Sequence, residues 1–371
     1  MPRSRPQPPT ARRPSRRRKS SPLFRWLLLL LLVGVGAWGA WTWELERTVV
    51  PAGATPLTLT VEPGMGVSQI AQQLHAMGLV HRPELFRAAV MLRGVAGHLK
   101  AGEYQLAGPI SLDGIVDKLA RGEVVRHTVT FPEGQDIESM AQLVVAQGVT
   151  PAAFRDAARQ VALIADLDPQ ATDLEGYLFP DTYDVSRRPD AAVVLVRRMV
   201  QRFRDVMAPE LPALRAGGRP LRAVVTLASI VETETARPDE RPRVAAVFLN
   251  RLQKGMALAT DPTIIYALRK AGRWDGNIRR GDLDIDSPYN TYRRPGLPPG
   301  PIASPGKASL LAALHPAQSD ELYFVSRNDG SHHFSRTFAE HQQAVNHYQR
   351  GRGAAPPEDV SPPPPVRPPA P

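Results

Sequence analysis

The sequence has no cysteine among its 371 residues, which excludes disulfide bonds and thiolate chemistry. It also has no acidic residue in positions 1–25, where nine of its arginines and lysines lie. Because the formal net charge of the whole chain is +10, the remaining sequence is close to neutral. This near-neutral part contains neither a basic face nor a nucleic-acid-reading motif, so we expect no nucleic-acid partner.

The N-terminal region predicts a membrane anchor. Residues 1–22 are rich in Arg, Pro and Ser and are expected to form a disordered, basic cytoplasmic arm. Residues 23–43 are predicted to be a single transmembrane helix, since Trp26 to Trp43 gives 18 residues without a charge and tryptophans at both ends. The basic arm places the N-terminus in the cytoplasm and the bulk of the chain outside it. The alternative is a cleaved signal peptide, with Ala37 and Gly39 at a suitable spacing, but the apolar run continues beyond them.

The rest of the chain is predicted to be α+β and to divide into several parts. We expect a linker at 44–56, a small α/β subdomain at 57–125, a mixed α+β catalytic domain at 126–350 and a disordered Pro-rich tail at 351–371. A weak repeat with an offset of 70 relates the stretch from Glu62 to the stretch from Pro132. Each copy predicts a strand, a glycine turn and an amphipathic helix that ends at glycine. The first copy resembles the LysM glycan-binding module; alternatively, both units only pack on the catalytic domain.

The stretch Leu221–Glu234 predicts a helix that is buried on most of its surface, because Ala223 to Val231 is almost entirely small or apolar. Glu232 follows Ala228 by four residues and Val225 by seven, so its carboxylate projects towards packed surroundings. A carboxylate in that position must be paired, protonated or functional. Glu234, about 200° further round the helix, cannot address the same bond.

Other segments are candidates for the walls of an active-site cleft. Residues 174–185 form a poor helix, and their Glu175, Tyr177, Asp181 and Tyr183 either line a cleft or fill a packed corner. The Pro- and Gly-rich stretch that begins at Ser287 predicts a long ordered loop of the functional kind, followed by a helix from about Gly306. Residues 322–345 predict a hairpin with a DG turn and a closing helix.

Four motifs together resemble the endolytic murein transglycosylase family, also called MltG or YceG-like: ASIVETE, VFLNRLQKGMALATDPTIIY, SPYNTYRRPGLPPGPIASPG and LYFVSRNDGSHHFSRTFAEH. The resemblance extends from the membrane segment to about Tyr348. It implies a single-pass inner-membrane enzyme with a LysM-like subdomain and a periplasmic catalytic domain. Such an enzyme cuts nascent peptidoglycan glycan strands and needs no cofactor. Peptidoglycan synthases are its candidate partners. The family's catalytic glutamate falls on Glu232. Thr233 and Ala259 stand where the family has lysine and glutamine, and neither change removes a carboxylate.

The resemblance also implies the chemistry. A lytic transglycosylase works with one acid, which protonates the glycosidic oxygen and then accepts the proton of the C6 hydroxyl of the same N-acetylmuramic acid. This leaves a 1,6-anhydro end and ends strand elongation, and burial of Glu232 would raise its pKa as such an acid requires. Glu234 is expected to pair with Arg237, Arg241 or Arg251 in a structural role. The family motifs place further groups around the glycan, with helix capping or loop hydrogen bonding as the alternative for each: Asp261, Thr263, Tyr289, Asn290 and Tyr292.

Three other functions were weighed. His332, His333, His341 and His347 lack the spacing of a zinc site, so no metal is expected. An aminodeoxychorismate lyase-like reaction on pyridoxal phosphate would need Lys254 as Schiff base and a phosphate-binding loop, and no such loop is visible. A non-catalytic glycan-binding scaffold of the cell-wall machinery would tolerate Glu232→Gln.

Overall fold

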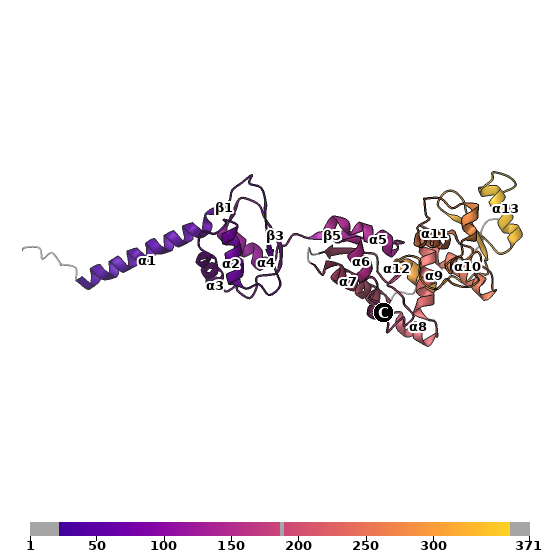
Figure 1. Cartoon of the computed structure of the whole chain (residues 1–371), viewed down its shortest axis with the longest axis horizontal. Coiled ribbons are helices and arrows are strands. Elements are labelled where there is room, and N and C mark those ends of the chain that lie inside the picture. Colours follow the sequence, from indigo (N-terminus) through magenta and orange to yellow (C-terminus); the bar gives the residue numbers. More distant parts are fainter. Residues whose placement is uncertain (1–21, 186–188, 357–371) are drawn as a thin grey trace, which may run out of the picture. The chain divides into compact units, whose positions relative to one another are not determined.

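The computed structural model describes residues 22–185 and 189–356 (Figure 1). The predicted N-terminal arm lies outside these residues except for Pro22, and the predicted Pro-rich tail lies outside them from residue 357 onward. The chain forms two compact units, residues 1–125 and 126–371, each a mixture of helices and short strands. This division coincides with the boundary expected between the small subdomain and the catalytic domain.

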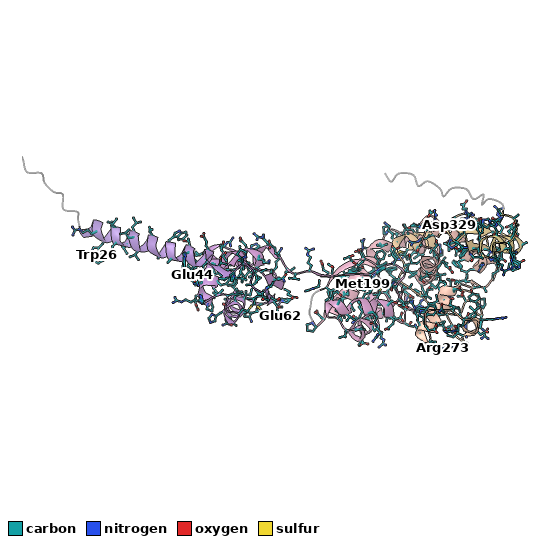
Figure 2. The ribbon with its side chains drawn as sticks, turned by 90° about the horizontal axis from the view of Figure 1, so that it is seen from above. Trp26, Glu44, Glu62, Met199, Arg273 and Asp329 are labelled. Carbon is teal, nitrogen blue, oxygen red and sulfur yellow. The ribbon has the colours of Figure 1, made fainter. Side chains whose placement is uncertain are left out.

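The first unit begins with α1 (Pro22–Glu46), which extends the predicted transmembrane segment by a few residues at its C-terminal end. Its stretch Arg25–Glu46 has a mean hydropathy of 1.6, and none of it is buried, so this helix is long and apolar enough to cross a membrane. Trp26 lies near its start and Glu44 near its end (Figure 2). Helix α1 is therefore a candidate membrane anchor.

A small folded body follows α1 directly. Its elements are β1 (Thr48–Val50), β2 (Leu57–Val61), α2 (Val67–Ala76), α3 (Pro83–Leu92), β3 (Gly102–Leu106), β4 (Ile110–Ser111) and α4 (Leu112–Arg121). Strand β2 pairs antiparallel with β3, from Leu57 opposite Leu106 to Val61 opposite Gly102. Residues 44–56 are not the expected linker, because they contain the end of α1 and strand β1, whose Val50 is buried in the core.

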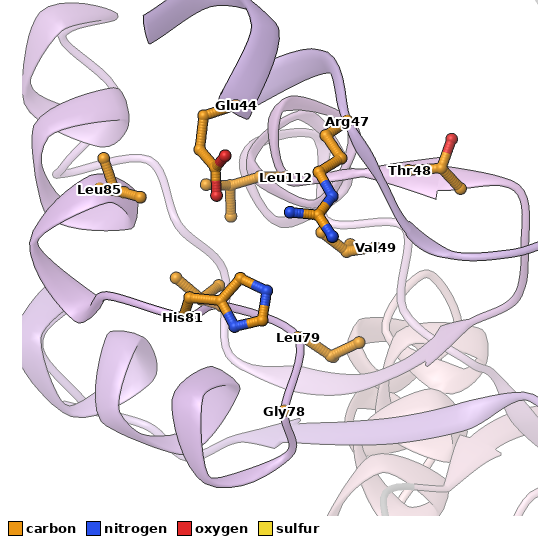
Figure 3. A pocket seen from close by; sticks show the side chains of 10 residues that line it. Glu44, Arg47, Thr48, Val49, Gly78, Leu79, His81, Leu85 and Leu112 are labelled. Carbon is orange, nitrogen blue, oxygen red and sulfur yellow. The ribbon is translucent and has the colours of Figure 1, made fainter. Parts of the chain in front are cut away.

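A cavity of about 90 Å³ lies in this unit beside the end of α1. The side chains of Glu44, Arg47 and His81 project towards it from the helix end, the start of β1 and the α2–α3 connection (Figure 3).

The second unit opens with the other copy of the repeat. Its elements are β5 (His127–Thr130), α5 (Ile137–Leu143), η1 (Val145–Gln147), α6 (Pro151–Ala157), η2 (Val161–Leu163), β6 (Thr182–Val185), α7 (Ala191–Met207) and α8 (Leu211–Ala216). Strand β5 pairs antiparallel with β6. Both copies of the repeat have the predicted strand–turn–helix form, with Gly64 and Gly134 at φ of +85° and +78° in the turns.

Helix α9 (Leu221–Glu234) lies at the centre of the second unit. The elements that follow it are α10 (Arg241–Gln253), α11 (Asp261–Lys270), η3 (Arg280–Asp284), α12 (Lys307–Leu314), β7 (Tyr323–Ser326), β8 (His332–Ser335) and α13 (Phe338–Tyr348). Helices α10, α11 and α12 all contact α9. Every residue from Val224 to Val231 is buried, as predicted for a core helix, and β7, β8 and α13 form the predicted hairpin and closing helix.

Candidate active site

Glu232 lies at the C-terminal end of α9, where the apolar run stops. Its side chain is only 5% exposed, and Val225 and Ala228 on the same helix face are fully buried. The predicted placement of this carboxyl against packed surroundings is therefore confirmed. Two donors reach it: Arg241 Nη2 lies 2.8 Å from Oε1, and the Gly306 backbone N–H donates to Oε2 at 2.9 Å.

A second carboxylate, Glu133, shares the same arginine. Arg241 is almost buried, and its Nη2 and Nη1 lie 3.4 and 3.5 Å from Glu133 Oε2. Glu133 comes from the turn between β5 and α5, and its side chain is 48% exposed. The two glutamates thus flank one guanidinium, with Glu232 on its enclosed side and Glu133 on its open side.

Backbone contacts bring this turn to the site. Gly134 N–H donates to the Ser304 carbonyl at 2.9 Å, and Ser304 N–H donates to the Gln135 carbonyl at 2.8 Å. A Cβ on Gly306 would lie 1.8 Å from Glu133 Oε1, so a larger residue there would displace the Glu133 side chain from its present position. The Pro- and Gly-rich loop therefore acts as a packed wall, and its residues 300–306 are buried.

Burial and several neighbouring groups affect the pKa of Glu232. Burial raises its pKa, and the neighbouring Glu133 charge raises it further. The Gly306 N–H, the Arg241 charge and the Ser309 side chain act in the opposite direction, and burial is the largest contribution. The result is a raised pKa, the direction that a general acid at neutral pH requires.

Glu234 faces a different set of groups. Its carboxylate accepts a hydrogen bond from the Thr260 hydroxyl, and burial raises its pKa while the Arg251 charge lowers it. Of the arginines expected as partners, Arg241 instead pairs with Glu232, and Arg237 pairs with Asp239 and Glu240. The two glutamates of the motif thus have separate surroundings, as their angular separation predicted.

The other predicted site residues divide into buried and accessible groups. Thr263 and Asn290 have no exposed surface: Thr263 bonds to the Thr260 carbonyl, and Asn290 donates to the carbonyls of Leu283 and Ile285 at 2.9 Å. These bonds hold the loop in place.

Asp261 and Tyr292 are exposed and bonded to each other at 2.6 Å, and Tyr289 packs on Tyr266 with ring centroids 4.8 Å apart. The alternative role of Asp261, capping of its helix, is not observed, because α11 begins at this residue and Thr260 takes the N-cap position.

The 174–185 segment is mainly a packed corner. Tyr177 donates to the buried Asp168 at 2.6 Å, and Tyr183 donates to the Phe179 carbonyl at 2.7 Å. Asp181 pairs with Arg202 near the surface. Glu175 differs, because it is buried and lines a cavity.

Sequence reasoning missed Glu133 and gave Arg241 to the wrong glutamate. A clue to Glu133 exists in the repeat, where the equivalent position in the first copy is Pro63. Lys254, the lysine that a pyridoxal phosphate reaction would need, is exposed at the end of α10. It therefore has no enclosed site in which to form a Schiff base. In the described part of the chain, no three His, Asp or Glu side chains are grouped so as to hold a metal ion.

Comparisons with known proteins agree on one family. The model of the YceG-like family matches residues 59–347. The endolytic murein transglycosylase of Bacillus subtilis is 31% identical over 329 residues, covering 82% of this chain and 88% of its own. That of Streptococcus pneumoniae strain D39 is 28% identical and covers 86% of this chain, which in turn spans only 63% of its length. The crystal structure of a yceG-like protein from Listeria monocytogenes has a TM-score of 0.54 at 31% identity, over 77% of this chain and 98% of its own.

Proposed function

The chain belongs to the YceG-like family, and on that premise we propose that it is an endolytic peptidoglycan lytic transglycosylase with Glu232 as its single acid and base. It cuts the bond between N-acetylmuramic acid and N-acetylglucosamine in nascent strands and so ends their elongation. The observation that carries the assignment of Glu232 is its enclosed carboxyl with a raised pKa beside Arg241 and the Gly306 N–H.

The reaction needs no water. Protonated Glu232 gives its proton to the glycosidic oxygen as the bond to C1 of the muramic acid breaks. The resulting carboxylate then accepts the proton of the C6 hydroxyl, whose oxygen forms the new bond to C1. Glu232 ends as it began, and the product carries a 1,6-anhydro end. Arg241 and the Gly306 N–H stabilise the carboxylate between the two steps.

Supporting roles are divided among the other predicted residues. Tyr289, Tyr292 and Asp261 are the groups with side chains accessible to a glycan, whereas Thr263 and Asn290 position the loop. Glu234 holds α9 against Thr260 at the start of α11.

The test is digestion of uncrosslinked glycan strands in ¹⁸O-labelled water, followed by mass analysis of the new ends. We expect anhydro ends without ¹⁸O, and no product with Glu232→Gln. Reducing ends that carry ¹⁸O would identify a hydrolase and contradict the mechanism.

The chain is placed in the inner membrane, held by α1 with its N-terminus in the cytoplasm and its catalytic unit in the periplasm. Protease added to spheroplasts should then digest a C-terminal tag but not an N-terminal one.

We assign the β2–α2–α3–β3 part of the first unit as a LysM-like glycan-binding module, which co-sedimentation of residues 57–125 with insoluble peptidoglycan would test. Peptidoglycan synthases are proposed as partners, and co-purification from detergent extracts would test this.

A further inference from the structure

A cavity of about 310 Å³ in the second unit is distinct from the immediate surroundings of Glu232. Its walls come from the start of α5, the end of α6, the 173–175 segment and the last turn of α11. Eight of the residues that line it are acidic or basic: Asp136, Glu138, Asp173, Glu175, Arg155, Arg159, Arg269 and Lys270.

Most of these charges are already neutralised by ion pairs. The pairs are Arg269 with Asp136 at 3.0 Å, Arg155 with Glu138 at 2.8 Å and Arg159 with Asp156 at 3.2 Å. Among the described residues, no ion pair reaches Glu175, Asp173 or Lys270. The cavity therefore offers two carboxyl groups and one ammonium group to a ligand.

Glu175 is the most unusual of these groups. It is 6% exposed, and its carboxyl oxygens accept only long hydrogen bonds: from Ile137 N–H at 3.2 and 3.3 Å and from the Tyr266 hydroxyl at 3.3 Å. Burial and the charge of Asp136 raise its pKa to about 8. At pH 7 this carboxyl is therefore mostly protonated, and a positively charged ligand would favour its ionised form.

Lys270 contacts the Tyr266 hydroxyl, which also contacts Glu175. Its Nζ lies 3.4 Å from the Tyr266 hydroxyl, which in turn lies 3.3 Å from Glu175 Oε2. Two unpaired groups of opposite sign thus flank one tyrosine oxygen. This spacing suits a ligand that carries an ammonium and a carboxylate on the same carbon.

The cavity is also close to the reacting bond. Glu133 shares Arg241 with Glu232, and Asp136 lines the cavity three residues later. Three residues of extended chain span at most about 11 Å, roughly the length of a disaccharide. A substituent on the muramic acid beside the cut bond therefore falls within reach.

We propose that this cavity binds the zwitterionic amino-acid group of the stem peptide carried by the muramic acid, with Glu175 on its ammonium and Lys270 on its carboxylate. This rests on the proposed action on peptidoglycan. It makes the enzyme selective for strands whose stems carry a diamino acid with a free amino and a free carboxyl group on its side chain.

The test compares kcat/KM of the full chain in detergent on three uncrosslinked substrates: strands with intact stems, the same strands with that amino group acetylated, and strands stripped of stems by an amidase. For the wild type we expect intact stems to be preferred over acetylated stems by about tenfold or more, as for a charge-assisted hydrogen bond. With Glu175→Gln, acetylation should make no difference, because the charge it would remove no longer has a partner.

Lys270→Gln provides a second variant at an exposed position, where misfolding is not expected. A fourth substrate, with the carboxylate of that zwitterionic group amidated, tests this variant: Lys270→Gln should abolish the effect of amidation while retaining the effect of acetylation. Asp205→Asn is the matched control, since Asp205 is an exposed carboxylate on α7 bonded only to Gln201; it should show the wild-type preference. Equal costs of acetylation in the wild type and in Glu175→Gln, or no preference in the wild type, would overturn the proposal.

A binding measurement separates this inference from the catalytic one. Cleavage of stripped strands by the wild type tests the transglycosylase assignment alone. Independently, a soluble stem tripeptide ending in the diamino acid should bind the wild type about tenfold more tightly than Glu175→Gln by titration NMR. Equal affinity of the two proteins would reject the stem-peptide site whatever the outcome of the cleavage assay.

Discussion

Glu232 and Glu234 lie two residues apart on one helix, yet they belong to different parts of the molecule. Glu232 contacts groups from three separate segments: Arg241 of α10, the turn before α5 through that arginine, and the start of α12. Glu234 bonds to Thr260, the N-cap residue of α11, and the carboxylate close to it is Asp261 of the same segment.

The two carboxyl groups differ in the neighbouring groups that can stabilise their charged and neutral forms. Burial raises the pKa of both. Only Glu232 has a cation within hydrogen-bonding distance to stabilise its charged form. A carboxyl that must lose and regain a proton needs both forms to be supported, whereas a structural carboxyl needs only one.

The largest expected effect comes from replacing each glutamate by its neutral isostere. Glu232→Gln should lower kcat/KM on uncrosslinked strands by about 10²- to 10⁴-fold, because the proton donor is lost. Glu234→Gln should stay within about threefold of the wild type, since it leaves the Glu232 surroundings intact. Steady-state rates of anhydro-end formation would measure both; equal losses in the two variants would remove the distinction.

Glu133→Gln should sharpen the distinction by changing the pH profile. The Glu133 charge raises the pKa of Glu232, so its removal lowers that pKa and Glu232 loses its proton at lower pH. The alkaline limb of kcat/KM should therefore shift to lower pH, with about a threefold to tenfold loss at pH 8 and a smaller loss at pH 5. Glu133→Asp should restore part of the profile, and Asp205→Asn, which changes an exposed carboxylate on α7, serves as control. An equal loss at every pH would instead indicate a structural role.

Glu234 should reveal itself in stability rather than in rate. Its pKa in the folded protein is raised by burial, so the stability it contributes is present at low pH and is lost as pH rises through that value. Relative to Glu234→Gln, the wild type should therefore become less stable as pH increases. Thermal unfolding of the soluble part of both proteins from pH 5 to pH 9 would measure this. A constant difference in melting temperature would mean that Glu234 does not titrate in this range.

The smallest expected effect is on stability and comes from Ala259, whose neighbour Thr260 bonds to Glu234. Ala259, next to Thr260, has a φ of +47°, a region that favours glycine. Ala259→Gly should raise the free energy of unfolding by about 1 kcal/mol or less, because relief of strain is partly offset by the greater freedom of glycine when unfolded. Urea titration would detect the change, and a loss of stability would contradict it.

The sequence predicted the parts of this site that depend on one helix. Helical geometry alone separated Glu232 from Glu234, and the apolar run before them indicated the buried face. The hairpin at 323–335 and the strand–turn–helix units were likewise visible, since each depends on residues close together in the chain.

The partner of Glu232 could not be found in this way. Arg241 is nine residues from Glu232 and also close to Glu234, so spacing did not decide between them. Its contact with Glu133 joins positions 108 residues apart and depends on how the β5–α5 turn packs against the start of α12. The cavity at Glu175 depends on three further segments in the same way. Such contacts follow from tertiary packing, which no local pattern encodes.

The absence of a linker after α1 has a consequence for where the enzyme works. Only Arg47 separates the end of α1 from strand β1, so the first unit has almost no slack relative to the helix. If α1 spans the inner membrane as proposed, the first unit is held at the lipid surface, and any glycan that this unit binds must lie there.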